Sequence, residues 1–209
     1  MNARQKQDDL PLVVTMTGAS GAVYAVRLLE VLLATGRQVH LSISPSGAAV
    51  LLQELQKKVA LDRFDPRSLL SPAIADKAAS QIHYHHYQDF FAPIASGSFL
   101  TAGMVVCPCS GSTLSGIAHG TSINLIQRAA DVQLKERRPL ILVPRETPLS
   151  LIHLDNMRAA ALAGAVILPA MPGWYHGVQS VADLVDFVVA RVLDQLRIPH
   201  ELMERWGQK

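Results

Sequence analysis

Three short loops rich in small and hydroxyl-bearing residues follow apolar runs of this sequence. They read TGASGA at 17–22, SPSG at 44–47 and PCSGST at 108–113. Small residues let the backbone approach a ligand closely, and the free N–H groups at the start of a following helix attract an anion. One such loop is weak evidence, because Ser and Thr are ordinary helix N-caps. Three of them at one end of a sheet predict a polar crevice that holds a phosphate-bearing cofactor.

The loop at 17–22 matches neither of the two common phosphate-binding motifs. A GxGxxG fingerprint would need a glycine at the position of Ser20, and a P-loop would need a lysine. We therefore expect neither a standard dinucleotide-binding site nor an ATPase. A tight strand-to-helix turn with Ser20 as the helix cap is the alternative interpretation of this loop.

Charged and nucleophilic residues offer further candidate sites. Arg145 and Glu146 follow another apolar run, where the arginine could bind a phosphate through two nitrogens and a surface ion pair is the alternative. Arg128 and Lys135 are seven residues apart, so they lie on roughly the same face of one helix, where ordinary solvated charge is the alternative. Cys109 has no legible partner for nucleophilic catalysis, and a packed thiol is favoured.

His83, His85 and His86 carry the side chains of a metal site. Alternation along a short strand explains the spacing of the first two equally well, and we favour this interpretation over metal binding. Cys107 and Cys109 stand one residue apart, a spacing that fits neither a disulfide framework nor a zinc pair. We therefore expect no metal.

The composition argues against several functional classes. A formal net charge of +2 is too small to indicate binding to nucleic acid or to an anionic membrane. No apolar run approaches the ~20 residues that span a bilayer. The polar segment 1–9 does not resemble a secretory signal, so we expect a cytoplasmic protein. Hydrophobic residues make up 49% and charged residues 17% of the chain, an apolar balance that favours a homo-oligomer.

The elements that position the loops alternate between short β-rich runs and longer helical stretches. Such alternation is typical of a parallel sheet covered on both faces, with ligands beyond the carboxyl ends of the strands. We expect a flexible N-terminal segment over 1–9 and one α/β domain over 10–209, built on a Rossmann-like (flavodoxin-like) doubly wound parallel sheet with helices on both faces. Strands are expected at 10–16, 39–44, 103–107, 139–143 and 165–168, and helices at 22–34, 47–58, 112–119, 124–137, 149–163 and 181–196. The stretch 61–81 is the least regular part.

Longer motifs follow a pattern that extends over nearly the whole chain. The most specific stretch reads NLIQRAAD at 124–131 and LKERRP at 134–139, followed by PRETP at 144–148 and IHLDNM at 152–157. ASGS at 95–98, PGWYH at 172–176 and the tail at 206–207 belong to the same pattern. Together with TGASGA, these motifs closely resemble the flavin prenyltransferases of the UbiX type.

The resemblance implies an enzyme that binds FMN and transfers a dimethylallyl group to N5 and C6 of the reduced flavin, without a metal. Dimethylallyl monophosphate is the donor in the bacterial members, and phosphate is released. The prenylated FMN passes to a decarboxylase of the UbiD type. Members of the family are usually dodecamers whose sites lie at subunit junctions.

The resemblance also assigns site residues. It implies catalytic roles for Ser20, Glu54, Lys135 and Glu146. It implies FMN binding by Gly18, Ala19, Ser20, Ser44, Ser110, Gly111, Ser112, Thr113 and Arg145. It implies donor binding by Arg128, Lys135, Tyr175, Arg191 and Trp206. These types suit the reaction, because cations stabilise a departing phosphate and aromatic faces shelter an allylic cation. Glu54, Glu146 and the released phosphate are all candidates for taking the C6 proton.

Two other functions are consistent with an FMN-binding fold. A flavin-dependent cysteine decarboxylase would carry a substrate clamp close to PxMNxxMW, whereas this chain reads IHLDNM at 152–157. A non-catalytic flavin carrier would need the loops but not Glu54, Arg128, Lys135, Tyr175 and Arg191 together. All five are present, so the prenyltransferase is favoured over both alternatives.

Overall fold

Six parallel strands form one sheet in the order β3-β2-β1-β4-β5-β6. The computed structural model describes residues 10–205 and 207 of the 209-residue chain, apart from the side chains at 77 and 78, so the segment 1–9 lies outside the described residues. The strands are β1 (Leu12–Met16), β2 (Val39–Ile43), β3 (Ile82–Tyr84), β4 (Gly103–Cys109), β5 (Leu140–Pro144) and β6 (Val166–Ile167). The order reverses between β1 and β4. Ligands of such sheets bind at this switch point, beyond the carboxyl ends of the strands.

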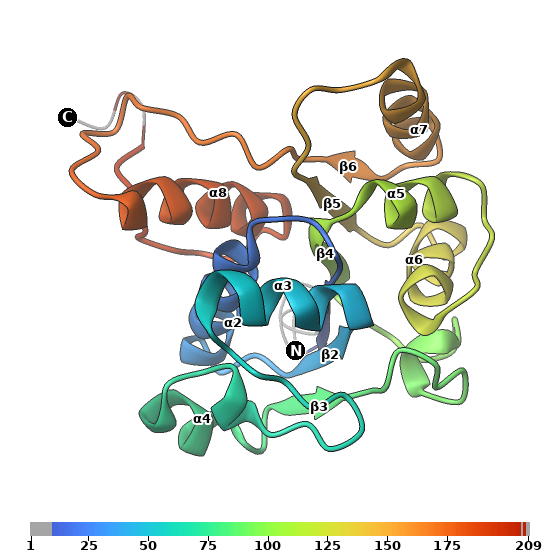
Figure 1. The fold of residues 1–209 in the computed structure, drawn as a ribbon, viewed down its shortest axis with the longest axis horizontal. Helices are drawn as coiled ribbons and strands as arrows, with labels where there is room; N and C mark the ends of the chain where they lie inside the picture. The colour runs from blue at the N-terminus through green and yellow to red at the C-terminus, as the bar shows by residue number, and fades with distance from the viewer. Residues whose placement is uncertain (1–9, 206, 208–209) are drawn as a thin grey trace, which may run out of the picture.

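Helices cover both faces of the sheet (Figure 1). On one side lie α2 (Ala22–Ala34), α4 (Pro72–Ala78) and α8 (Val181–Gln195), and on the other lie α5 (Gly111–Ala118), α6 (Leu125–Lys135) and α7 (Leu151–Leu162). The remaining elements are α3 (Pro45–Leu55), which packs beside α2, and the 3-10 turns η1 (Pro66–Ser68) and η2 (Pro93–Ala95). The arrangement confirms the doubly wound α/β fold. No helix in the described part of the chain has the length and apolar character needed to cross a membrane.

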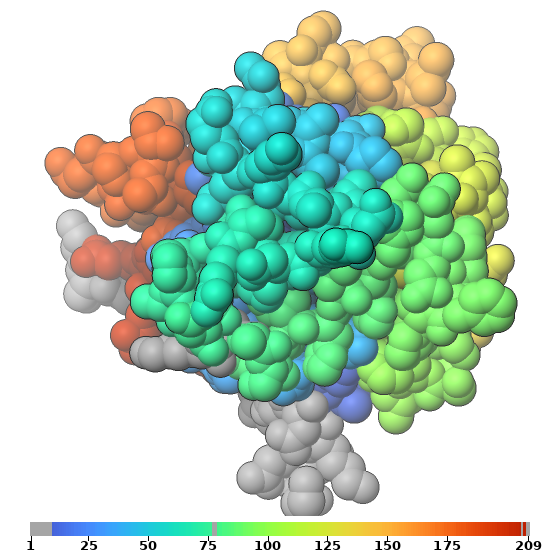
Figure 2. Space-filling view, turned by 60° about the horizontal axis from the view of Figure 1, so that its bottom comes forward, coloured from blue at the N-terminus to red at the C-terminus, as the bar shows by residue number. Residues whose placement is uncertain are grey.

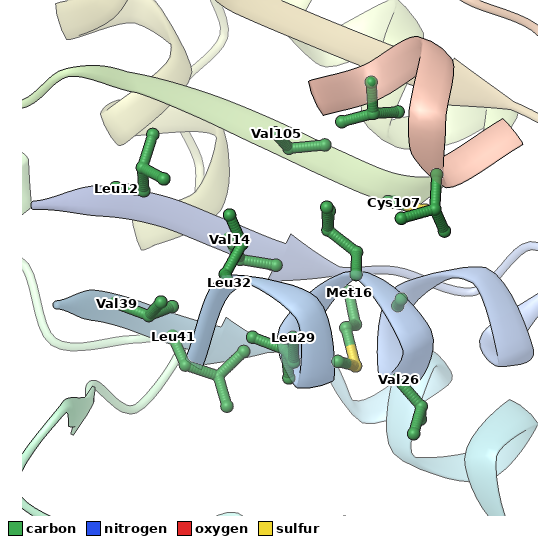
Figure 3. Close-up of a cluster of buried hydrophobic side chains, with 14 of the residues drawn as sticks. Leu12, Val14, Met16, Val26, Leu29, Leu32, Val39, Leu41, Val105 and Cys107 are labelled. Carbon is green, nitrogen blue, oxygen red and sulfur yellow. The ribbon is translucent and has the colours of Figure 1, made fainter. Parts of the chain in front are cut away.

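Two apolar clusters fill the spaces between the sheet and its two helix layers. Side chains along a strand alternate between the clusters, because successive residues point to opposite faces. In β1, Val14 and Met16 belong to one cluster and Val13 to the other. Figure 3 shows the first cluster, where Leu29 and Leu32 of α2 lie over the strands. Burial on both faces explains why the inner strands are continuous apolar runs.

The expected elements agree with the described ones, with two exceptions. The helix 22–34 has the expected bounds, and the other expected ends differ by three residues or fewer. The exceptions are the stretch 61–81, which contains η1 and α4, and the short turn η2. The seven residues of α4 are too few to show a helical period in the sequence, although Pro72 at its first turn is a typical helix start.

Candidate active site

The loop after β1 enters α2 through Gly21, whose φ of 111° lies in the left-handed region that glycine adopts readily. This N-cap has no side-chain oxygen for the free N–H groups of the first turn. Glu54 of α3 supplies one instead. Its carboxylate accepts hydrogen bonds from Gly21 N at 3.0 and 3.1 Å and from Ala22 N at 2.9 Å. The carboxylate therefore occupies the anion-binding position at the start of α2.

The Glu54 carboxylate is held in its charged form. Burial alone would raise its pKa, but hydrogen bonds from the Ser20 hydroxyl and from the N–H groups of the loop outweigh burial. The Arg145 guanidinium adds an attraction in the same direction. The pKa of Glu54 therefore lies below its usual value, and the group is ionised at neutral pH.

Arg145 reaches the same loop from the end of β5. Its Nε donates to the carbonyl oxygen of Ser20 at 3.3 Å. Its two terminal nitrogens make no hydrogen bond with the described part of the chain. Ser20, Glu54 and Arg145 come from three distant segments and meet at the carboxyl end of the sheet. A hydroxyl, a carboxylate and a guanidinium with available donors can bind a polar ligand that carries an anionic group.

Thr17 connects the loops after β1 and β4. Its buried hydroxyl donates to the carbonyl oxygen of Pro108 at 2.8 Å and accepts a hydrogen bond from Ser110 N at 2.8 Å. Ser110 in turn caps α5, because its Oγ accepts from Thr113 N at 3.3 Å. Thr17 is absent from the site residues expected from the sequence. A threonine that ends an apolar run and precedes a glycine-rich loop is the signal that could have identified it.

The loop after β2 packs against the loop after β1. Ser44 Oγ accepts from Gly47 N at 3.0 Å, and Pro45 takes the first helical position of α3, where its missing N–H removes no helical hydrogen bond. A Cβ on Gly18 would stand 2.4 Å from Cβ of Ser46, so only glycine allows this close approach. The three small-residue loops thus lie together at the carboxyl end of the sheet.

His153 of α7 lies against the third loop. Its Nδ1 accepts from Ser150 N at 3.2 Å in a capping box at the start of α7. A ring nitrogen that accepts is unprotonated, so the neutral ring carries its proton on Nε2. A Cβ on Gly111 would stand 3.2 Å from that Nε2, so an N–H donor faces the start of α5. His153 is also absent from the expected site residues, although its spacing from Ser150 is that of a capping box.

The expected donor-binding residues of α6 pair with neighbours on their own helix or just beyond it. Arg128 pairs with Asp131 at 3.7 Å, and Lys135 pairs with Glu136. Lys135 also lies against the ASGS loop, because a Cβ on Gly97 would stand 2.7 Å from its Nζ. Glycine at this position therefore leaves room for the ammonium group.

The remaining expected donor-binding residues belong to the opposite side of the sheet. Tyr175 is 53% exposed in the segment between β6 and α8, which stands out from the body of the molecule (Figure 2, orange). Arg191 of α8 pairs with Asp194 at 2.7 Å. Trp206 lies outside the described residues. Because α6 and α8 cover opposite faces of the sheet, one chain does not bring Lys135 and Arg191 together.

Glu146 follows Arg145 at the end of β5 and is exposed. Its Oε1 accepts a hydrogen bond from Thr147 N at 3.3 Å. The other carboxylate oxygen of Glu146 accepts no hydrogen bond from a described residue. The expected catalytic role of Glu146 therefore rests on its place beside the Ser20–Glu54–Arg145 cluster in the chain.

His40 of β2, His83 of β3 and His85 just beyond β3 form a packed cluster. The rings of His83 and His85 stack on His40 at centroid distances of 4.9 and 5.0 Å. His40 Nδ1 lies 2.8 Å from His85 Nε2, and His83 Nε2 lies 2.8 Å from Gln38 Oε1. No three His, Cys, Asp or Glu side chains among the described residues are arranged to hold a metal ion. Ring stacking and two hydrogen bonds account for these side chains.

Cys107 and Cys109 are buried free thiols at the end of β4. Burial raises the pKa of Cys107 to about 12 and also raises the pKa of Cys109. Such thiols are protonated at neutral pH and are poor nucleophiles. The interpretation of Cys109 as a packed thiol is confirmed.

Comparison with known proteins identifies the family. A model of the Flavoprotein family matches residues 1–193. The UbiX flavin prenyltransferase of Pseudomonas aeruginosa is 52% identical over 200 residues, which cover 95% of this chain and 94% of that protein. The chain belongs to the UbiX flavin prenyltransferases.

Two solved structures of UbiX-type proteins share the fold of this UbiX family member. AnUbiX, solved in complex with FMN and dimethylallyl pyrophosphate, is 40% identical with a TM-score of 0.81, and the match covers 96% of this chain and 98% of AnUbiX. A dodecameric FMN-dependent UbiX-like decarboxylase from Escherichia coli O157:H7 is 42% identical with a TM-score of 0.81, and the match covers 95% of this chain and all of that chain. The similarity therefore extends over the whole UbiX fold, including the three loops and α8.

Proposed function

We propose that this protein is a flavin prenyltransferase that transfers a dimethylallyl group from dimethylallyl monophosphate to N5 and C6 of reduced FMN and releases phosphate. One observation supports the assignment most directly: Ser20, the charged Glu54 and Arg145 meet at the switch point of the sheet. Membership of the UbiX family and the dimethylallyl pyrophosphate bound to AnUbiX support the donor class. The prenylated FMN would serve a decarboxylase of the UbiD type.

The residues of the three loops suit a flavin that carries a phosphate. The start of α5 offers N–H groups and the hydroxyls of Ser110, Ser112 and Thr113, and Arg145 has terminal nitrogens directed to no described acceptor. These are the donors that a phosphate requires. We assign FMN binding to Gly18, Ala19, Ser20, Ser44, Ser110, Gly111, Ser112, Thr113 and Arg145. When bound, reduced FMN supplies the nucleophilic N5 and C6 atoms.

The charged residues of α6 and α8 suit the donor. Arg128, Lys135 and Arg191 would stabilise the anion that leaves, and Tyr175 would orient it. Trp206 completes the expected set. As the donor loses phosphate, an allylic cation develops, and aromatic faces stabilise such a cation.

Donor binding by α6 and by α8 requires more than one copy of the chain. The two helices lie on opposite faces of the sheet, so residues of different subunits would complete each site. Large apolar side chains are exposed far from the core, among them Phe91 at 100%, Leu151 at 79% and Ile123 at 74%. Exposed apolar surface of this kind marks protein interfaces. We therefore propose a homo-oligomer, and the dodecameric UbiX-like structure suggests twelve subunits.

The two carboxylates, Glu54 and Glu146, differ in how well they suit acid–base catalysis. Glu54 is ionised and can hold the Ser20 hydroxyl as a hydrogen-bond donor, which gives that hydroxyl a fixed orientation toward the ligand. A lowered pKa makes Glu54 a weak base, since a base works best when its pKa lies near the working pH. Glu146 is exposed and makes one hydrogen bond with the part of the chain that the structure describes. Glu54, Glu146 and the released phosphate all remain candidates for taking the C6 proton.

The free thiols are consistent with a reducing compartment. Cys107 and Cys109 are both unpaired, and free thiols persist where the cell keeps them reduced. We propose that the enzyme acts in the cytoplasm as a single domain over 10–209.

The test uses purified protein, reduced FMN and dimethylallyl monophosphate under anaerobic conditions without added metal. Mass spectrometry of the extracted flavin is expected to show a gain of one five-carbon prenyl unit, and an Arg191→Ala variant is expected to lose it. A sample without donor is the control. Unmodified FMN with both the monophosphate and the diphosphate donor would overturn the assignment. It would favour a flavin carrier, or a cysteine decarboxylase if a cysteine-containing peptide loses carbon dioxide instead.

A further inference from the structure

Asp194 of α8 binds three basic side chains at once. Its Oδ2 accepts a hydrogen bond from Arg191 Nη1 at 2.7 Å, and its Oδ1 accepts from Arg205 Nη2 at 2.8 Å. His200 Nε2 lies 3.1 Å from the same Oδ1. Arg191 is on the helix itself, whereas His200 and Arg205 belong to the segment that follows it. One carboxylate therefore joins Arg191, the proposed donor-binding residue, to the segment 196–205 that follows α8, here called the C-terminal segment.

The second contact of His200 distinguishes its two ring nitrogens. Its Nδ1 accepts a weak hydrogen bond from Leu202 N at 3.4 Å, so Nε2 is the nitrogen that donates to Asp194. The His200 side chain is almost fully buried. The single carboxylate of Asp194 therefore faces two guanidinium groups, those of Arg191 and Arg205, in addition to the imidazole.

The chain reverses direction after α8 and returns to it. Arg197 N donates to the carbonyl oxygen of Asp194 at 3.0 Å, and Ile198 N donates to that of Leu193 at 3.0 Å. Ile198 is buried in the core, and the C-terminal segment lies beside α8 (Figure 1). The contacts of Arg205 and His200 with Asp194 fix the end of this return. Arg205 directly precedes Trp206, the residue expected to line the prenyl pocket.

We propose that Asp194 is a positioning residue for the transfer, which orients Arg191 toward the donor phosphate and docks the C-terminal segment beside it. The inference rests on the proposed function, because it takes Arg191 to bind the donor. A guanidinium held by a carboxylate through one of its nitrogens keeps the other nitrogens free for a phosphate and loses less freedom when it binds. Arg205, held by the other oxygen, brings a second guanidinium into the same cluster.

The Asp194→Asn variant separates this role from a simple electrostatic one. The substitution removes one negative charge, so the net charge of the cluster becomes more positive by one. Electrostatics alone would then strengthen donor binding. Loss of positioning predicts the opposite, a KM for dimethylallyl monophosphate that rises about 10-fold, with kcat and the KM for FMN changed far less. Asp194→Glu keeps the charge and is expected to restore part of the affinity.

A matched control lies on the same helix. Asp186 of α8 binds Arg27 of α2 through Nε at 2.6 Å and Nη2 at 3.1 Å, so Asp186→Asn also removes an α8 carboxylate from its arginine partner. It is expected to leave the donor KM unchanged. Amide hydrogen exchange over 198–205 is expected to quicken in Asp194→Asn and not in Asp186→Asn, and both are measured in the full-length protein.

The outcomes separate the two claims. A wild-type enzyme that prenylates FMN, together with an Asp194→Asn variant whose donor KM is unchanged or lower, would overturn the positioning role alone. A wild-type protein that forms no prenylated FMN and binds no donor in calorimetry would overturn the proposed function and the positioning role together. A raised donor KM in both Asp194→Asn and Asp186→Asn would assign the effect to α8 stability and would also overturn the positioning role.

Discussion

Glu54 and His40 each lie in a polar cluster, and the pKa of each is lowered, but for opposite reasons. The Glu54 carboxylate accepts hydrogen bonds from the loop after β1, and these favour its charged form against burial. His40 is 7% exposed, and burial is the main cause that lowers its pKa to about 4, with His85 and His83 acting in the same direction. The surroundings of Glu54 stabilise its charged carboxylate, whereas the surroundings of His40 favour its neutral imidazole.

The difference separates the cluster that we propose to be functional from one that packs the sheet. Around Glu54 the donors come from a loop at the switch point, and Arg145 keeps nitrogens available for a ligand. Around His40 the neighbours are the rings of His83 in β3, His85 just after β3, and Phe99 in the segment before β4. A lowered pKa alone therefore does not mark an active site. What marks it is whether charge is stabilised by groups that a ligand can also reach.

The largest effect is expected from Glu54→Gln. The amide presents an NH2 group to N–H donors that need an acceptor, and the Ser20 hydroxyl loses its anionic partner. Formation of prenylated FMN is expected to fall by at least about 100-fold. Single-turnover assays with reduced FMN measure the change. Glu30→Gln, which alters a half-buried ion pair with Arg27 on α2, serves as the control and is expected to keep full activity. Full activity of Glu54→Gln would mean that the charge of the Glu54 cluster is not needed for the transfer, and the contrast with the His40 cluster would be lost.

The next effect concerns pH and His40. The folded pKa of His40 is about 4 and its ordinary value is 6.5, so between these values the unfolded chain binds more protons than the folded chain. Stability is therefore highest above pH 6.5 and falls by up to about 3 kcal/mol as the pH drops toward 4. Glu54 stays ionised over most of this range, because its pKa is lowered from 4.5.

Urea unfolding at pH 7, 6 and 5 measures this loss of stability. His40→Gln is expected to flatten the pH dependence. His119→Gln replaces an exposed histidine at the end of α5 and is expected to leave the slope unchanged. An unchanged slope in His40→Gln would remove His40 from the explanation and would assign the pH dependence to other groups.

A smaller effect is expected from Arg145→Ala. The variant loses a guanidinium whose terminal nitrogens are available to an anion, and the Kd for FMN is expected to rise about 10-fold. Fluorescence titration with FMN measures the affinity. Arg158→Ala on α7 removes another cation and is expected to leave the Kd unchanged. Equal weakening by both variants would point to net charge in place of a specific contact.

The smallest effect is expected from Ser110→Ala. It removes the side-chain cap of α5, a loss of about 1 kcal/mol in unfolding free energy. The same experiment with Ser180→Ala, which caps α8 far from the three loops, is expected to cost a similar amount. Only Ser110→Ala is expected also to weaken FMN binding, which would separate its two roles.

Local features of this chain could be predicted from the sequence, and long-range pairings could not. The helix 22–34 and the three serine-containing loops follow from apolar periodicity and N-cap chemistry, which act over a few residues. The place of Glu54 came from the resemblance to UbiX enzymes. Its contact with Gly21 joins residues 33 apart, and no local pattern encodes that contact. The stacking of His85 on His40 spans 45 residues and depends on the register of β2 and β3.

The separation of α6 and α8 has a consequence in genetic terms. If each site draws Lys135 from one subunit and Arg191 from another, a Lys135→Ala allele and an Arg191→Ala allele damage different parts of the same site. Mixed assemblies of the two gene products would then contain some junctions with both residues intact. Two alleles that are each inactive alone would therefore complement one another in a merodiploid cell.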